Sequence, residues 1–167
     1  MTTTRQFDIV FDTTTNTMTV RRAFDGARQL VWDCHTQSPL LDQWFAPKPL
    51  TTKTKSMDFR AGGHWHYAMV MPDGQAFWGR LDYQTINPID GYTLLDSFCD
   101  EDGAINPDLP RANWNVSFKD ASGRTLVQTI VTYKSREDLE KVIAMGMKEG
   151  MTSTLERLDE LLLTIAK

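Results

Sequence analysis

The sequence predicts an α+β fold in which a curved antiparallel sheet wraps around one long C-terminal helix. Two observations carry this prediction. From Ser135 to Ile165, apolar side chains recur at steps of three and four, which is the spacing of one helical face. From Thr52 to Tyr133, apolar and polar residues instead alternate with period two between short turn sequences, as in successive strands.

Composition indicates a single soluble domain spanning residues 1–167. The net charge of −4 and the pI near 5.3 argue against nucleic acid as a partner. The start of the chain lacks an apolar signal core, and no apolar run approaches the ~18 residues of a membrane span, so we expect a cytoplasmic location. Cys34 and Cys99 lack metal-binding spacing, which favours reduced, mostly buried thiols.

The N-terminal part predicts a β-hairpin followed by two short helices. Alternating apolar residues mark strands at 6–11 and 18–24, with a polar turn between them. A first short helix is expected at 27–35. A second begins with Ser38 as its cap and Pro39 in its first turn, and stops before Pro47.

The middle of the chain predicts six further strands, connected mostly by short turns. They start near Thr52 and then cover 65–71, 76–86, 92–98, 114–118 and 125–133. The Pro72-Asp73-Gly74 sequence is a strong hairpin signal. Strands that follow one another through short turns favour antiparallel pairing, so we expect a sheet of about seven strands, with the strand at 6–11 as an addition.

The C-terminal segment predicts one continuous helix about 45 Å long. Ser135 and Asp138 have the spacing of a capping box at its start. Gly146 and Gly150 lie four residues apart, and each costs roughly 1 kcal/mol in a helix interior relative to Ala. We expect Gly146 to leave room for a ligand and Gly150 to allow close packing against the sheet.

A series of short motifs occurs in an order that resembles a known family. The motifs are Val31-Trp32, Trp44-Phe45-Ala46-Pro47, Phe59-Arg60-Ala61-Gly62-Gly63-His64-Trp65, Pro72-Asp73-Gly74, Gly79 with Pro88, Gly123-Arg124-Thr125-Leu126, and Gly150 followed by Leu155, Leu158 and Leu162. From about residue 17 to 166, this order resembles the activator of Hsp90 ATPase homologue 1-like (AHSA1-like) branch of the START/Bet v 1-like (SRPBCC) superfamily.

The resemblance implies a helix-grip fold, with a cavity between the sheet and the C-terminal helix. Two departures leave the ligand open. The frequent Trp-Trp-Gly-Pro sequence of the family is Trp-Phe-Ala-Pro here, and the strand at 6–11 is extra.

Aromatic and Met side chains are the candidate lining of that cavity. Met is flexible and polarizable, and aromatic walls are typical of small-molecule pockets, although a filled core would use the same residues. The candidate ligand-binding residues are Trp44, Phe45, Trp65, Tyr67, Met69, Phe77, Tyr83, Trp114, Met147 and Met151.

No residue is assigned a catalytic or metal-binding role, and no cofactor is expected. His64 and His66 share one face of a strand and could bind a metal with Asp82, but the opposite face carries Trp65 and looks buried. The two His are therefore expected on the outer, hydrated face. The sequence lacks the GxSxG, GxGxxG and P-loop patterns.

Three carboxylates, Asp33, Asp82 and Asp96, could enter the cavity as acid/base groups. Each is expected instead at the surface or beside an Arg such as Arg80.

Three functions remain. The preferred one is a module that binds a small hydrophobic or aromatic molecule without chemistry. The second is a cyclase, dehydratase or hydrolase, which needs an ionisable group with a perturbed pKa inside the cavity. The third is a domain that interacts with an Hsp90-type chaperone ATPase, for which the sequence offers only Lys48, Lys53 and Lys55, expected in a solvated loop. The sequence leaves open whether the protein forms a homodimer.

Overall fold

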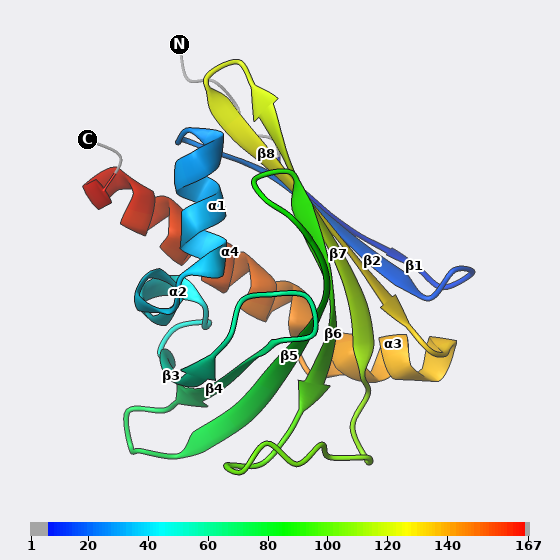
Figure 1. The fold of residues 1–167 in the computed structure, drawn as a ribbon. Helices are drawn as coiled ribbons and strands as arrows, with labels where there is room; N and C mark the ends of the chain where they lie inside the picture. The colour runs from blue at the N-terminus through cyan, green and yellow to red at the C-terminus, as the bar shows by residue number, and fades with distance from the viewer. Residues whose placement is uncertain (1–6, 166–167) are drawn as a thin grey trace.

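The computed structural model describes residues 7–165 (Figure 1). Parts of three expectations lie outside the described residues. They are Gln6 of the predicted first strand, the start of the chain at 1–6, where no signal peptide was expected, and Ala166 at the end of the resemblance. No helix in the described part of the chain is long and apolar enough to span a membrane.

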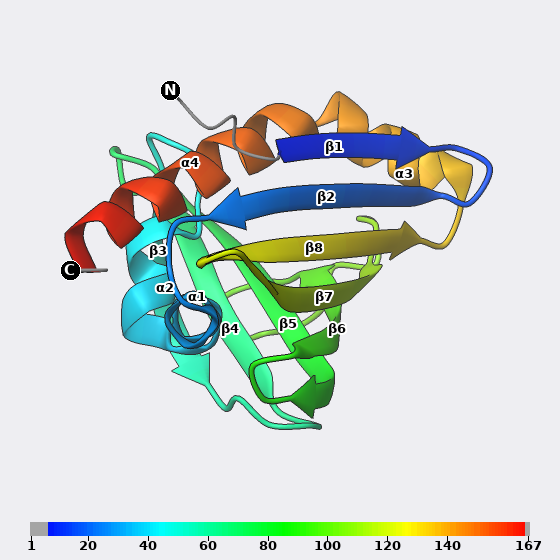
Figure 2. The ribbon, with the colours of Figure 1, turned by 90° about the horizontal axis from the view of Figure 1, so that it is seen from above.

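The structure confirms the α+β helix-grip fold. All neighbouring strands in its sheet pair antiparallel, in the order β1-β2-β8-β7-β6-β5-β4-β3. The strands are β1 (Phe7–Asp12), β2 (Thr17–Phe24), β3 (Thr51–Met57), β4 (His64–Val70), β5 (Ala76–Asn87), β6 (Gly91–Phe98), β7 (Ala112–Ala121) and β8 (Arg124–Tyr133). The sheet curves, and α4 (Met147–Ile165) lies across its concave side (Figures 1 and 2).

Two short helices, α1 (Arg28–Thr36) and α2 (Ser38–Trp44), follow β2 as expected. One detail of the prediction is wrong: Ser38 is the first helical residue, and the N-cap is Gln37, which makes no side-chain cap hydrogen bond. Pro39 still lies in the first turn, where a missing N–H costs nothing because that group has no partner within the helix.

The predicted continuous C-terminal helix is wrong in the structure. It consists of α3 (Arg136–Ala144) and α4, and a turn at Met145 and Gly146 separates them. Gly146 has φ +90°, a conformation that ends helices and that Gly adopts without steric cost. The predicted cap at the start of α3 is confirmed, because the Asp138 backbone N–H donates to Ser135 Oγ at 3.1 Å.

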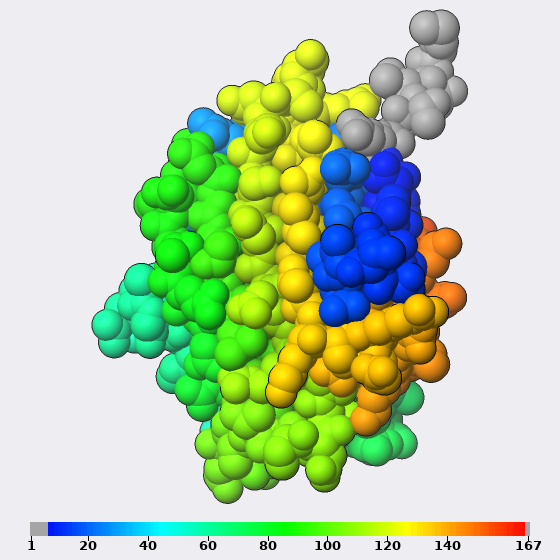
Figure 3. All heavy atoms as spheres, turned by 90° about the vertical axis from the view of Figure 1, so that its right-hand side faces the viewer, coloured from blue at the N-terminus to red at the C-terminus, as the bar shows by residue number. Residues whose placement is uncertain are grey.

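The N-terminal hairpin extends the sheet beside these helices. In the space-filling view, β1 and β2 lie next to α3 and α4 (Figure 3). The backbone N–H of Tyr133, at the end of β8, donates to the carbonyl of Asn16 in the hairpin turn at 2.9 Å. Arg22 of β2 is buried and pairs with Asp159 of α4, so a charged contact joins the hairpin to the long helix.

His64 and His66 lie on the convex face, opposite buried Trp65, but the expected hydration of His66 is wrong. Its side chain is buried because the loop after β6 folds over it. His66 Nε2 donates to the carbonyl of Asp100 at 3.0 Å, and the ring lies 5.0 Å from that of Trp78. His64 Nε2 lies 3.2 Å from Ser56 Oγ. The two imidazoles are therefore held by separate partners.

Candidate functional site: a cavity between the sheet and α4

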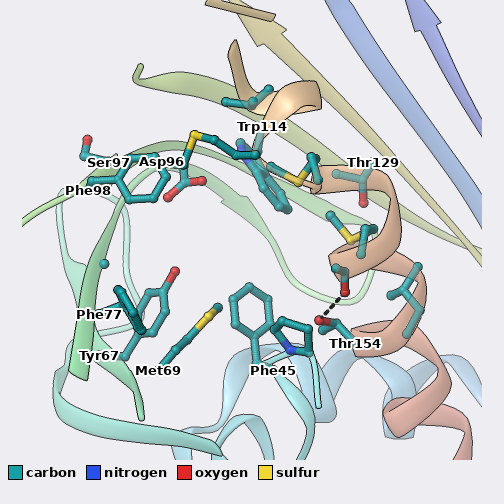
Figure 4. A pocket seen from close by; sticks show the side chains of 18 of the residues that line it. Phe45, Tyr67, Met69, Phe77, Asp96, Ser97, Phe98, Trp114, Thr129 and Thr154 are labelled. Carbon is teal, nitrogen blue, oxygen red and sulfur yellow. Dashed lines mark hydrogen bonds between the residues drawn. The ribbon is translucent and has the colours of Figure 1, made fainter. Parts of the chain in front are cut away.

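A cavity of about 280 Å³ lies between the concave face of the sheet, the end of α2 and the first turns of α4 (Figure 4). Half of its lining residues are Phe, Tyr, Trp or Met. They are Trp44, Phe45, Tyr67, Met69, Phe77, Trp78, Tyr92, Phe98, Trp114, Met145, Met147 and Met151.

Strand alternation delivers most of these side chains to one face. Tyr67 and Met69 on β4 pair with Gly79 and Phe77 on β5, so all four positions face the same side of the sheet. Met147 and Met151 lie four residues apart in α4 and so share a helical face. The cavity is therefore built on strands and a helix.

The structure brings eight of the ten sequence-predicted residues to the cavity and leaves out Trp65 and Tyr83. Both are buried on the same face of the sheet but further into the core. The Trp65 ring stacks on that of Tyr67 at 4.0 Å, and Tyr83 packs against Phe59 at 4.8 Å. They support the cavity wall without reaching its surface.

The mouth of the cavity is marked by two half-exposed lining side chains, Phe77 at 51% and Met145 at 54%. Phe77 stands near the start of β5, and Met145 belongs to the turn between α3 and α4. The break in the predicted long helix therefore lies at the entrance of the cavity. The spacing of apolar residues did not predict this break.

Asp96 of β6 is the polar centre of the site. Its carboxyl group points into the cavity, as does the hydroxyl of Tyr67 (Figure 4). Burial raises the pKa of Asp96 to about 7, and the Ser97 backbone N–H and the nearby indole N–H of Trp114 oppose that rise. Burial, together with the charge of Asp96, also raises the pKa of Tyr67 well above its usual value, so Tyr67 is neutral.

The indole N–H of Trp114 is buried, and its geometry to any acceptor falls short of a proper hydrogen bond. It lies near enough to Asp96 to lower the pKa of that carboxyl. Since the register places Trp114 opposite Leu94, two positions along β6 from Asp96, the indole approaches the carboxyl diagonally. A buried donor of this kind is available to an additional acceptor.

Three further polar side chains at the lining, those of Ser97, Thr154 and His35, already have hydrogen-bond partners. Ser97 Oγ accepts from Arg111 Nε at 2.7 Å and points away from the cavity, and Thr154 Oγ1 donates to the Gly150 carbonyl at 2.8 Å (Figure 4). His35 Nδ1 donates to the Val31 carbonyl at 2.8 Å, and burial lowers its pKa to about 4. His35 is therefore neutral at pH 7, and no Lys or Arg lines the cavity in the described chain.

Of the three carboxylates weighed from the sequence, only Asp96 lines the cavity, so its expected surface position is wrong. Asp82 pairs with Arg80 at 2.9 Å, and Asp33 accepts from Gln29 at 2.9 Å. A signal for Asp96 exists in the sequence. Period two places it on the same face as Tyr92, Leu94 and Phe98, the inward positions of its strand.

The other groups considered from the sequence lie elsewhere. Lys53 and Lys55 belong to strand β3 and not to a loop, and Lys48 pairs with Glu160 at 3.0 Å. Within residues 7–165, no three or more His, Cys, Asp or Glu side chains are grouped so as to hold a metal ion. Cys34 and Cys99 are free thiols.

Solved structures support the fold assignment. Protein Ms6760 from Mycobacterium smegmatis is 29% identical, with a TM-score of 0.86 over 95% of this chain and 97% of the other. A protein from Arthrobacter aurescens is 28% identical, with a TM-score of 0.89 over 96% and 93% of the two chains. An AHSA1 protein from Silicibacter pomeroyi, 19% identical, shares the fold with a TM-score of 0.70 over 89% and 98%.

Comparison with curated proteins gives no significant match. The family model described as activator of Hsp90 ATPase homolog 1-like protein matches residues 25–163, which begins later than the resemblance seen in the sequence. That match covers most of the chain and both walls of the cavity. The protein therefore belongs to the family of activator of Hsp90 ATPase homolog 1-like proteins.

Proposed function

We propose that the protein binds a small hydrophobic or aromatic molecule in the cavity between the sheet and α4. The observation that carries this proposal is an apolar chamber of about 280 Å³ with two apolar side chains at its mouth. Well-packed cores hold few voids larger than a water molecule, and ligand pockets start at roughly 300 Å³. The chamber therefore has the size and lining of a small-ligand site.

A matched pair of substitutions tests this proposal. Met69→Trp places a larger side chain in the cavity wall, whereas Met71→Trp makes the same change two residues further, at a position that does not line the cavity. The probe is 2-phenylethanol, a neutral aromatic alcohol, and binding is followed by titration calorimetry. We expect Met71→Trp to bind like the wild type and Met69→Trp to lose at least tenfold in affinity. Equal binding by the two variants would refute the cavity as the site.

One observation favours an enzyme as the second candidate. A carboxyl group with a pKa near 7 in an apolar chamber is suited to general acid or base catalysis at neutral pH. However, the described lining supplies no second ionised group to act with Asp96, because Tyr67 and His35 are both neutral. Binding without chemistry therefore has the stronger support.

A further inference from the structure

We propose that the cavity selects organic cations, that is, small amines with an aromatic or alkyl body, whose charged nitrogen lies between the Asp96 carboxylate and the aromatic walls. This inference rests on the proposed ligand-binding function and adds the chemical class of the ligand. Its basis is the sign of the charges around the cavity, together with the polar groups and rings that converge on Asp96.

The charge balance of the lining is one-sided. Asp96 is the one carboxyl among the described lining residues, and no Lys or Arg offsets it. Two basic side chains close to β6 in the fold lie on its convex face, where Arg80 pairs with Asp82 and Arg111 donates to Ser97. An anionic ligand would be buried beside a carboxylate without a counter-charge, which is strongly unfavourable.

The titratable groups on which the charge of Asp96 acts do not change this balance. They are Tyr67 on β4, Tyr133 on β8 and, more weakly, Cys99 after β6, and the pKa of each is raised, that of Cys99 to about 11. All three are therefore neutral near pH 7. A cation next to Asp96 would supply the opposite charge that the site lacks, and would allow the carboxylate to stay ionised in the apolar chamber.

The two polar groups beside Asp96 fit a bound ammonium. The Tyr67 hydroxyl points into the same space, and its oxygen can accept a hydrogen bond from N–H of the ligand (Figure 4). The buried Trp114 N–H is without a well-aligned acceptor and can donate to Asp96 once the carboxyl group is ionised. In this arrangement the ligand donates to Asp96 and Tyr67, and Asp96 also accepts from Trp114.

The aromatic walls supply the second attraction. Phe45, Tyr67, Phe77, Phe98 and Trp114 all line the chamber. The faces of aromatic rings carry partial negative charge and attract cations, most strongly where water is excluded. A neutral or anionic ligand of the same shape gains the apolar contacts but not this attraction. The site therefore discriminates by charge more than by shape.

Three probes of similar shape and different charge test the inference: 2-phenylethylamine, 2-phenylethanol and 3-phenylpropanoate. Binding to the full chain is measured by titration calorimetry at pH 8, where Asp96 is mostly ionised and the amine is protonated. We expect the amine to bind at least tenfold more tightly than the alcohol, and the propanoate to show no detectable binding.

Two variants assign the preference to Asp96. Asp96→Asn should weaken binding of the amine at least tenfold and leave binding of the alcohol within about threefold of the wild type. The control Asp33→Asn makes the same change at α1, outside the cavity, and should keep the order of the three probes. Circular dichroism and a melting curve at pH 8 confirm that each variant is folded.

A second measurement needs no variant. Between pH 6 and pH 8 the wild type should bind the amine more tightly as pH rises, because Asp96 ionises in this range, whereas binding of the alcohol should not tighten. An alcohol that binds as tightly as the amine, or an amine preference that survives in Asp96→Asn, would overturn the inference and leave the apolar site intact. If none of the three probes binds, the proposed function fails as well.

Discussion

Gly79 lies directly opposite Tyr67 in the β4–β5 ladder, and a Cβ atom at Gly79 would lie 2.7 Å from both Cζ and the hydroxyl oxygen of Tyr67. Real Cβ atoms do not approach other atoms this closely, so the ring occupies space that only Gly leaves free. The position of the Tyr67 hydroxyl in the cavity therefore depends on a missing side chain on the neighbouring strand.

Gly79→Ala should destabilise the protein by roughly 1–3 kcal/mol, because the added methyl group displaces the Tyr67 ring. Urea denaturation measures the loss. Tyr67→Leu removes the ring, so the double variant should lose less than the sum of the two single variants. Strictly additive losses would show that the two residues do not compete for this space.

Gly146→Ala should destabilise the protein by about 1–2 kcal/mol, since Gly146 has φ +90° and a Cβ atom is strained there. Gly146→Asn should cost less than Gly146→Ala, because Asn tolerates this conformation better. Thermal or urea unfolding gives both values. This reverses the expectation from the sequence, in which Gly146 left room within a helix. A stabilising effect of Ala would mean that the helix continues through this turn.

Gly150→Ala should stabilise the protein by up to ~1 kcal/mol, because Gly150 lies within α4 and an added Cβ meets only Pro47 Cγ, at 3.9 Å. Gly150 also lines the cavity, so the same substitution should slightly weaken binding of 2-phenylethanol. The close packing expected from the sequence is wrong at this position. A loss of stability on this substitution would restore it.

The two glycines show what apolar spacing contains and what it omits. Steps of three and four included the buried Leu139, Val142, Leu155, Leu158 and Leu162 but left out Thr154 and Leu161, which are also buried. The spacing of apolar residues does not depend on the φ angle of Gly146, so it could not predict the turn at the cavity mouth. Period two gives the face of the strand residues, Asp96 included, except where bulges between Thr54 and Ser56 and between Tyr83 and Thr85 shift the register.

Asp96 and His35 should give opposite pH dependences of stability. The pKa of Asp96 is raised to about 7 in the folded state, so its contribution is present below pH 4 and is lost as pH rises to 7. The pKa of His35 is lowered to about 4, so its contribution is present above pH 6.5 and is lost as pH falls toward 4. Between pH 4 and pH 6.5 the two effects partly cancel in the wild type.

Asp96→Asn separates these effects. The free energy of unfolding of the wild type, minus that of the variant, should fall as pH rises from 4 to 7, by up to about 4 kcal/mol, and then stay level. Water inside the cavity would reduce that amount. The free energy of unfolding of the variant should fall as pH drops from 6.5 to 4, because the loss from His35 is no longer offset by a gain from Asp96. Urea unfolding at half-unit steps of pH measures both curves, and a constant difference would contradict the raised pKa of Asp96.

Trp65→Ala should cost on the order of 3–5 kcal/mol, the range of large aromatic truncations in cores. Trp65 is fully buried, stacks on Tyr67, and donates from Nε1 to Thr54 Oγ1 at 3.0 Å. Trp78→Ala, on the convex face, is the control and should cost clearly less. Guanidinium denaturation compares the two. Equal costs would mean that the faces of β4 and β5 are assigned the wrong way round.

The site itself was harder to predict than the fold. The apolar lining follows from alternation, but Asp96 was expected at the surface because carboxylates are rarely buried. Asp96 is partly buried between neighbouring strands, opposite Leu81 on β5 and Ala112 on β7, in a cavity whose other wall is α4. These neighbours are distant in sequence. The covering of His66 by the loop after β6 is of the same kind, since no local pattern states where a loop folds back.

The pairing of β2 with β8 determines how far the chain can be shortened at its N-terminus. The family match begins at residue 25, one residue after β2 ends, yet β2 pairs with β8 along its whole length, from Thr17 with Thr132 to Phe24 with Thr125. A recombinant fragment of 25–163 would turn β8 into a bare sheet edge, open to pairing with other molecules. Such a fragment should aggregate, so the N-terminal hairpin belongs in any piece used to study ligand binding.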